Sequence, residues 1–172
     1  MSNETEFSRR TFAGAVAAFG AVTVLGCGDG ARSQAPDAGP TAAPPGPALR
    51  QMIVYRDPSC PCCEKWAAMA DEAGYQVRVV DHPDMPAIKT QYGVPDELAS
   101  CHTGVIGDYA IEGHVPFAHL ARLLRDRPDG VIGLAVAGMP AGSPGMEVAG
   151  GAQDEFEVMA FDKSGKFTPF KA

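Results

Sequence analysis

Met52-Ile53-Val54-Tyr55, followed closely by Cys60-Pro61-Cys62-Cys63, is the stretch of this 172-residue chain that sets its architecture. The first four residues form a short continuous apolar run that Asp57-Pro58 closes, a pattern typical of a buried strand. Beyond the cysteine turn, residues recur at helical spacing until Gly74 supplies a stop; they are Cys63, Trp66, Ala67, Ala70 and Ala73. The sequence therefore predicts a strand, a cysteine-rich turn and a helix, in that order.

The following segments predict a second strand, a helix and a hairpin. Residues 77–80 read Val-Arg-Val-Val, and residues 85–92 predict a short helix that Gly93 ends. The first two strands should be parallel, because a crossover helix connects them. Residues 103–106 and 109–112 are strand-like and are separated by only two residues, Gly107-Asp108, as in a tight hairpin.

A third helix and a C-terminal hairpin complete the predicted domain. Pro116 opens a helix with one apolar face, made of Phe117, Leu120, Leu123 and Leu124. Residues 130–136 are apolar but interrupted by glycine, and we assign them no element. Residues 156–161 and 166–170 flank Asp162-Lys163-Ser164-Gly165 and predict the hairpin. The order β-α-β-α-β-β-α is that of a thioredoxin-like domain, an α/β fold with a mixed sheet and flanking helices, here expected over residues 49–172.

The N-terminus predicts export. Arg9-Arg10 precedes an uncharged apolar run over residues 13–25, and Gly26-Cys27 follows. A basic start, a short apolar stretch and small residues before a cut are typical of an export signal, here residues 1–27, and the paired arginines resemble a twin-arginine signal. A run of about 13 residues is too short to anchor the chain across a bilayer. We therefore expect the protein in the periplasm or cell envelope.

The end of this signal offers two outcomes for Cys27. Val24-Leu25-Gly26-Cys27 resembles a bacterial lipoprotein box, although Leu25 stands where a smaller residue is usual. In that case Cys27 carries a lipid anchor, which is the only membrane contact that we expect; the alternative is an ordinary cleaved signal that leaves Cys27 discarded or free. Residues 28–48 contain almost no large apolar side chain and predict a flexible Pro/Gly/Ala linker.

The charge of the chain argues against one class of partner. It has 14 Lys and Arg residues against 21 Asp and Glu residues, a net charge of −7, and no basic cluster. Proteins that bind nucleic acid concentrate positive charge on one surface. We therefore expect no nucleic-acid partner.

Cysteine is where the chemistry of the chain is concentrated. Three cysteines occur in residues 60–63, where adjacent side chains on a turn cannot all face one core, and Cys101 stands in Ser100-Cys101-His102-Thr103. In a thioredoxin-like domain the first helix begins at the cysteine turn, and the loop before the third strand lies against it. We therefore expect four sulfurs to converge, those of Cys60, Cys62, Cys63 and Cys101.

Sulfur at this density predicts a metal-ion or redox site, and its ligand chemistry suits copper. Thiolates are soft ligands that favour Cu(I), adjacent thiolates can bridge ions into clusters, and the N-terminus of a helix stabilises the thiolate form. Zinc is the nearest rival metal, but structural zinc sites usually separate their paired ligands in sequence, whereas Cys62 and Cys63 are adjacent. Imidazole suits Cu(II), so a mixed site could also cycle between Cu(I) and Cu(II).

Two histidines are candidate ligands. His114 is the preferred imidazole ligand because the end of the hairpin could bring it to face the cysteines. His102 adjoins Cys101 in sequence and is a candidate for a ligand or for an orienting group. Glu112 is expected to be a solvated residue at the end of a strand, with orientation of His114 as the alternative.

Two methionines lie in a segment rich in Gly and Pro, residues 138–147. The thioethers of Met139 and Met146 could bind Cu(I) or could keep water away from the thiolates. The alternative for each is an ordinary role in filling gaps of the core.

Several motifs together resemble one family. They are Cys60-Pro61-Cys62-Cys63 with Glu64-Lys65-Trp66, Gly93-Val94-Pro95, Ser100-Cys101-His102-Thr103, Glu112-Gly113-His114-Val115-Pro116, Gly138-Met139-Pro140 and Gly142-Ser143-Pro144-Gly145-Met146-Glu147. In these motifs the chain resembles the CopG-type bacterial copper-resistance proteins, which are thioredoxin-like envelope proteins. The resemblance implies a copper cluster on the Cys-x-Cys-Cys motif and the distal cysteine, and a role in copper tolerance. Pro61 stands where the family more often has Gly, and it should stiffen the turn without removing a ligand.

These observations favour a metal-binding protein over an enzyme. Its expected partners are copper ions and envelope proteins of copper export or copper delivery. The alternative is a thiol-disulfide oxidoreductase in which Cys60 is the nucleophile and Cys63 the resolving thiol. The additional Cys62, and His102 in the place of the expected cis-proline, weaken that alternative.

Overall fold

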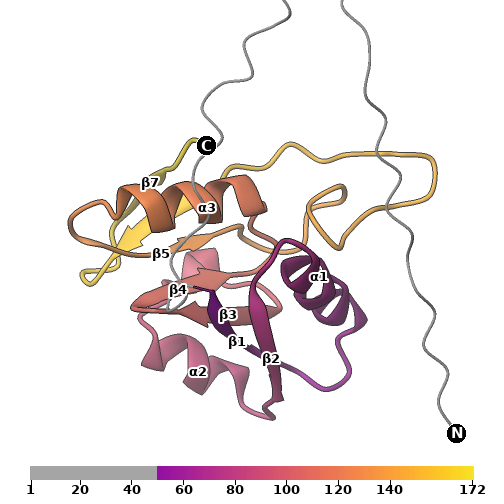
Figure 1. Cartoon of the computed structure of the whole chain (residues 1–172), viewed down its shortest axis with the longest axis horizontal. Helices are drawn as coiled ribbons and strands as arrows, with labels where there is room; N and C mark the ends of the chain where they lie inside the picture. The colour runs from indigo at the N-terminus through magenta and orange to yellow at the C-terminus, as the bar shows by residue number, and fades with distance from the viewer. Residues whose placement is uncertain (1–49) are drawn as a thin grey trace, which may run out of the picture. The chain divides into compact units, whose positions relative to one another are not determined.

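A computed structural model describes residues 50–172. The predictions for the export signal, the lipid anchor at Cys27 and the linker lie outside these residues. The described chain forms one seven-stranded mixed sheet in the order β2-β1-β3-β4-β5-β6-β7 (Figure 1). Among the described residues, no helix is long and apolar enough to cross a membrane.

The cysteine turn joins the first strand to the first helix. β1 (Gln51–Arg56) runs parallel to β2 (Gln76–Asp81), and α1 (Pro61–Glu72) connects them. Pro61 occupies the start of α1, where its missing N–H costs no hydrogen bond. Gly74 follows the helix with φ 92°, a left-handed conformation that glycine adopts without strain. The predicted β-α-β unit is confirmed.

The second half of the core is a hairpin followed by a helix. After α2 (Met85–Gln91) and the 3-10 turn η2 (Asp96–Leu98), β3 (His102–Ile106) pairs antiparallel with both β1 and β4 (Tyr109–Glu112). α3 (Phe117–Asp126) then begins directly after Pro116. The strand order β2-β1-β3-β4 and these connections confirm the thioredoxin-like fold.

Three further strands extend the sheet beyond β4. β5 (Val131–Ala135) is parallel to β4 and was not predicted, because Gly133 interrupts its apolar run. A Cβ atom at Gly133 would collide with the Phe161 ring and the Ala110 carbonyl, so glycine is needed where these groups approach. β6 (Met159–Asp162) and β7 (Phe167–Pro169) form the predicted C-terminal hairpin.

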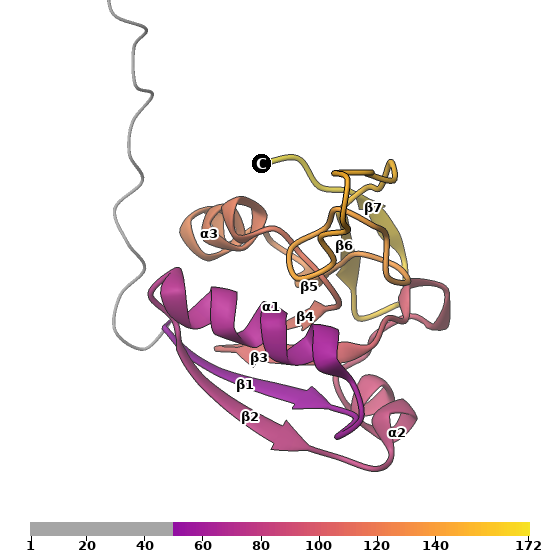
Figure 2. The same cartoon turned by 90° about the vertical axis from the view of Figure 1, so that its right-hand side faces the viewer.

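The helices lie on both faces of the sheet. α1 and α3 cover one face and α2 covers the other, as the two views show (Figures 1 and 2). The larger core lies under α1 and α3, and its fully buried members include Met52, Val54, Trp66, Ile106, Ile111, Leu120, Leu123 and Leu134. This packing holds α1, and therefore the cysteine turn, against the sheet.

Candidate metal centre

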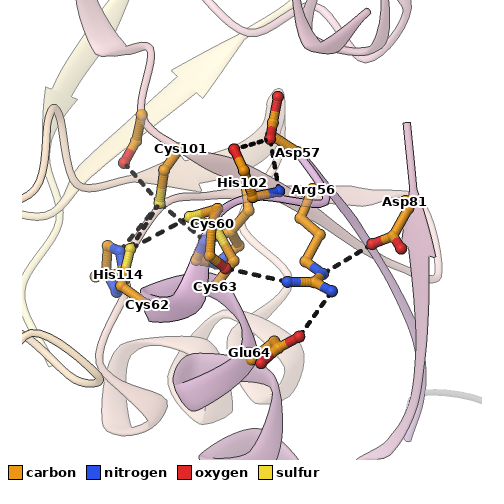
Figure 3. The surroundings of a disulfide bond; sticks show 12 residues. Arg56, Asp57, Cys60, Cys62, Cys63, Glu64, Asp81, Cys101, His102 and His114 are labelled. Atoms are coloured by element: carbon orange, nitrogen blue, oxygen red, sulfur yellow. Dashed lines mark hydrogen bonds and ion pairs between the residues drawn. A yellow bond between two sulfur atoms is a disulfide. The ribbon is translucent and has the colours of Figure 1, made fainter. Parts of the chain in front are cut away.

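The pairing of β1 with β3 brings the two cysteine segments together. Arg56 at the end of β1 is in register with His102 at the start of β3. The turn that begins α1 follows Arg56, and Cys101 immediately precedes β3. The two cysteine segments therefore meet where β1 ends and the antiparallel β3 begins. Sulfur atoms of Cys60, Cys62, Cys63 and Cys101 all lie within 4.8 Å of one another (Figure 3). The expected convergence of the four cysteines is therefore present.

The four sulfurs occupy two covalent states. Cys60 and Cys63 form a disulfide with a Cα–Cα distance of 5.6 Å, whereas Cys62 and Cys101 are free thiols. Cys62 Sγ lies 3.3 Å from Cys60 Sγ and 3.9 Å from Cys101 Sγ. The free thiol of Cys62 is thus placed between the disulfide and the thiol of the facing loop. Reduction of the disulfide would provide four thiols in one cluster.

His114 is oriented toward Cys101. Its Nε2 atom lies 3.1 Å from Cys101 Sγ, and its Nδ1 atom lies 2.8 Å from the carbonyl oxygen of Pro144. A carbonyl only accepts hydrogen bonds, so Nδ1 carries the hydrogen and the lone pair of Nε2 faces the sulfurs. This is the tautomer that a metal ligand requires.

His102 also approaches Cys101. Its Nδ1 atom is 3.3 Å from Cys101 Sγ, and its ring packs 4.7 Å from the Trp66 ring between centroids. His102 is fully buried, and its Nε2 has no hydrogen-bond partner among the described residues. Cys101, His102 and His114 form a second group whose ligand atoms lie within 4.8 Å of one another.

Burial keeps these groups neutral in the metal-free site. It lowers the pKa of His102 well below its usual value, with smaller contributions from His114 and Lys89, and it also lowers the pKa of His114. Burial, and then the neighbouring Cys62, raise the pKa of Cys101 to about 12. Both imidazoles are therefore available to bind a cation, and Cys101 is a thiol that a cation would convert to thiolate.

The segment from 138 to 147 packs against the site. Gly138 forms an isolated bridge with Ser100, next to Cys101. A Cβ atom at Gly145 would lie 3.0 Å from the backbone nitrogen of Trp66 and 3.3 Å from the carbonyl oxygen of Cys62, so this glycine packs against the N-terminal part of α1. The side chain of Met139 is 54% exposed and that of Met146 is half-buried. The methionines thus belong to a loop beside the cysteines, and their role as ligands stays a prediction.

Arg56 supports the cysteine turn and was not anticipated. Its guanidinium donates to the Cys60 carbonyl at 3.1 Å and forms ion pairs with Glu64 at 2.8 Å and Asp81 at 2.9 Å (Figure 3). The signal in the sequence was a basic residue at the end of an apolar strand, directly before the turn.

The expectation that Glu112 is solvated was wrong. Its side chain is fully buried and forms an ion pair with Lys89 at 2.5 Å. Burial raises the pKa of Glu112, whereas Lys89, Thr103 and the Ser100 amide act in the opposite direction. The Glu112 carboxylate bonds to these three groups rather than to His114, so its contacts do not orient the imidazole directly.

The fold and the site together define a class: a thioredoxin-like protein whose cysteine-rich first turn faces a Cys-His loop able to hold a metal. Two solved structures of copper resistance protein CopG, Form 1 and Form 2, share 40% identity with this chain, each with a TM-score of 0.65. The matches cover 69% of this chain and 93% and 94% of those chains. The chain therefore belongs to the CopG family.

The other comparisons are narrower. A family model described as a protein of unknown function, DUF411, matches residues 98–146. That range contains Cys101, His102 and His114 but not the cysteine turn. No curated protein matches the chain.

Proposed function

We propose that this protein binds Cu(I) as a polynuclear thiolate cluster on Cys60, Cys62, Cys63 and Cys101, and thereby contributes to copper tolerance in the cell envelope. The observation that carries the proposal is the convergence of four sulfurs within 4.8 Å. Thiolates favour Cu(I), and sulfurs this close can each bridge two ions. The relatives named copper resistance protein CopG support copper as the metal.

The cluster belongs to the reduced protein. Two electrons and two protons convert the disulfide of Cys60 and Cys63 into two thiols, which join the free thiols of Cys62 and Cys101. Copper then displaces the thiol protons, because only the thiolate binds the metal. A reductant such as a small thiol is needed for the first step.

The histidines extend the proposal to Cu(II). Cys101, His102 and His114 form a mixed group of one sulfur and two imidazoles, and imidazole is a suitable donor for Cu(II). The sulfur-rich and mixed groups share Cys101, so a Cu(I) ion that loses one electron to an external acceptor would need only a small change of ligands. The thioethers of Met139 and Met146 on the adjoining loop are further candidates for Cu(I).

The experiment is an anaerobic Cu(I) titration of the reduced protein, with metal measured by elemental analysis and free thiols counted in parallel. We expect more than one copper per protein and protection of all four cysteines from alkylation. Cys60→Ser, Cys62→Ser, Cys63→Ser and Cys101→Ser should each lower the copper content. Cys27→Ser is the matched control and should retain it. Full copper content in any of the first four variants would remove that residue from the site.

A thiol-disulfide oxidoreductase is the second candidate function. The disulfide of Cys60 and Cys63 lies at the start of α1, and Cys62 Sγ is only 3.3 Å from Cys60 Sγ. In this reaction a substrate thiolate attacks one disulfide sulfur, and a second exchange releases the oxidised substrate while both protein thiols gain protons. Oxidation of a model dithiol peptide separates the candidates, since Cys60→Ser should abolish such activity and Cys101→Ser should spare it. If the wild-type protein shows no turnover, the oxidoreductase candidate is rejected and copper binding is the remaining proposal.

Location and partners belong to the same proposal. The N-terminal sequence supports export to the periplasm or envelope, with lipidation at Cys27 as the candidate anchor. Copper-export or copper-delivery proteins of the envelope are the proposed partners. Cell fractionation of the wild-type protein and Cys27→Ser tests the anchor, which predicts that only the variant is released in soluble form.

A further inference from the structure

One buried carboxylate lies beneath the loop that carries Cys101. The Glu112 side chain is fully buried, and its Oε1 atom accepts a hydrogen bond from the Ser100 amide at 2.6 Å. Its Oε2 atom accepts a hydrogen bond from the Thr103 hydroxyl at 2.7 Å. Ser100 and Thr103 stand on either side of Cys101 and His102 in the sequence. The carboxylate therefore holds both ends of the Cys101-His102 pair.

Lys89 completes this arrangement from another element. Its ammonium group donates to Glu112 Oε1 at 2.5 Å and to the Thr103 hydroxyl at 3.4 Å. The Lys89 side chain is only 13% exposed, so the pair is held with little access to water. Three donors thus converge on two oxygens, and the bonds to an ionised acceptor are among the stronger hydrogen bonds in proteins.

The backbone of Glu112 leads to the other half of the mixed group. Gly113 donates its N–H to the His102 carbonyl at 2.9 Å, and His114 follows. Gly113 has φ 69°, and a Cβ atom there would collide with the Ser100 side chain and lie 2.7 Å from the Val136 carbonyl. The end of β4 is therefore pressed against the Ser100 loop. Glu112 is thus hydrogen-bonded through its side chain to the Cys101 segment, and its backbone continues directly into the His114 segment.

A buried ion pair of this kind is poor support for stability alone. Removing two charges from water costs about as much as their attraction returns, and apolar replacements are often neutral or stabilising. Its effect on geometry is different, because a carboxylate bonded on both sides of a dipeptide restricts where that dipeptide can lie. The distance of 3.1 Å between Cys101 Sγ and His114 Nε2 is the geometry that such a restraint would preserve.

We propose that Glu112 is the positioning residue of this site: with Lys89 it holds the Cys101-His102 loop so that Cys101 Sγ stays against His114 Nε2. Glu112 touches no metal ligand atom itself and acts through Ser100 and Thr103. Its effect on copper rests on the proposed function, but its effect on the Cys101 thiol does not.

The test compares Glu112→Gln with Glu155→Gln in the whole protein. Gln offers one acceptor oxygen to the three donors and no charge to Lys89, whereas Glu155 is an exposed carboxylate, so its variant changes the net charge equally. The first readout is metal-free: the ratio of alkylation rates at Cys101 and Cys62, measured by peptide mass spectrometry with the disulfide intact. We expect the ratio to rise on the order of 3-fold or more in Glu112→Gln, because the loop can open.

The second readout is Cu(I) affinity by competition with a chromogenic chelator. Loss of an outer partner of a metal site typically costs about 10-fold or more in affinity, and we expect that loss only in Glu112→Gln. If Glu112→Gln does not fold, Thr103→Val and Thr103→Ser test the same hydrogen bond from the other partner. Val removes the hydroxyl and should raise the alkylation ratio, and Ser retains the hydroxyl and should restore it.

The outcomes separate the two proposals. Folded Glu112→Gln and Thr103→Val with the alkylation ratio of the wild type would overturn the positioning role, even if both variants melt earlier. A raised ratio in a protein that binds no copper at all would support the positioning role and would reject the proposed copper function.

Discussion

His102 shows how burial determines the state of a single residue. Its ring is enclosed by Trp66 and by the edge of the His114 ring, with centroids 4.7 Å and 5.1 Å away. An imidazolium there would lose its hydration and face repulsion from Lys89, and burial is the largest cause of its lowered pKa. The metal-free site therefore contains a neutral ring next to Cys101.

This lowered pKa predicts acid destabilisation. The unfolded chain takes up a proton at His102 as the pH falls through about 6.5, while the folded chain does not, so stability present above that pH is lost toward lower pH. His102→Phe should reduce this loss because it keeps a ring against Trp66 and removes the titration. The measurement is urea unfolding of the metal-free protein at about pH 7.5 and about pH 5. His102→Phe should still lose some stability at the lower pH, since the pKa of His114 is also lowered. An equal loss of stability in the wild type and in His102→Phe would contradict the prediction.

At the scale of elements, the loop of residues 138–147 meets α1 through a glycine. Gly145 has φ 83°, and a Cβ atom there would be so close to the backbone of Cys62 and Trp66 in α1 that one side of the contact would have to shift. The chain contains a single tryptophan, Trp66, whose backbone lies at this contact. The loop and the cysteine turn are therefore in contact, and Trp66 can report on that contact.

We expect Gly145→Ala to move this loop away from the cysteines. Gly150→Ala is the matched control, because Gly150 has φ 90° and a Cβ atom added there would meet nothing within 4 Å. Both variants carry the left-handed strain of about 1–2 kcal/mol, but only Gly145→Ala should also weaken Cu(I) binding and shift the fluorescence of Trp66. The measurements are chelator competition and emission spectra. Equal behaviour of the two variants would show that the loop does not affect the site.

Local patterns explain which elements the sequence predicts well. Pro61 and Gly74 mark the two ends of α1, and the pair Gly107-Asp108 marks the hairpin of β3 and β4. β5 was not predicted because Gly133 interrupts its apolar pattern. Glycine is needed there because the Phe161 ring, from a residue distant in sequence, packs against it. The burial of Glu112 was not predicted because its partners are also distant in sequence: Lys89 and Ser100 are 23 and 12 residues away. The convergence of the cysteines was predictable because the fold, once recognised, places both segments.

For the whole molecule, copper should act as a stabilising ligand. A ligand that binds only the folded state, at a concentration about 1,000 times its Kd, adds about 4 kcal/mol to the free energy of unfolding. We therefore expect the Tm of the reduced protein to rise with Cu(I), and a strong Cu(I) chelator to reverse the rise. Cys101→Ser should lose most of this effect. A Tm that does not respond to copper would contradict binding to the folded state.

The distance along the chain between Cys62 and Cys101 has one more consequence. A copper ion held by both sulfurs would close a ring of polypeptide 39 residues in span, which contains all of β2 and α2. A protease that cuts inside this ring would leave two fragments still joined through the metal. The copper-loaded chain could therefore be nicked without being divided, and the metal would add a link to the strand pairing that already holds the two pieces together.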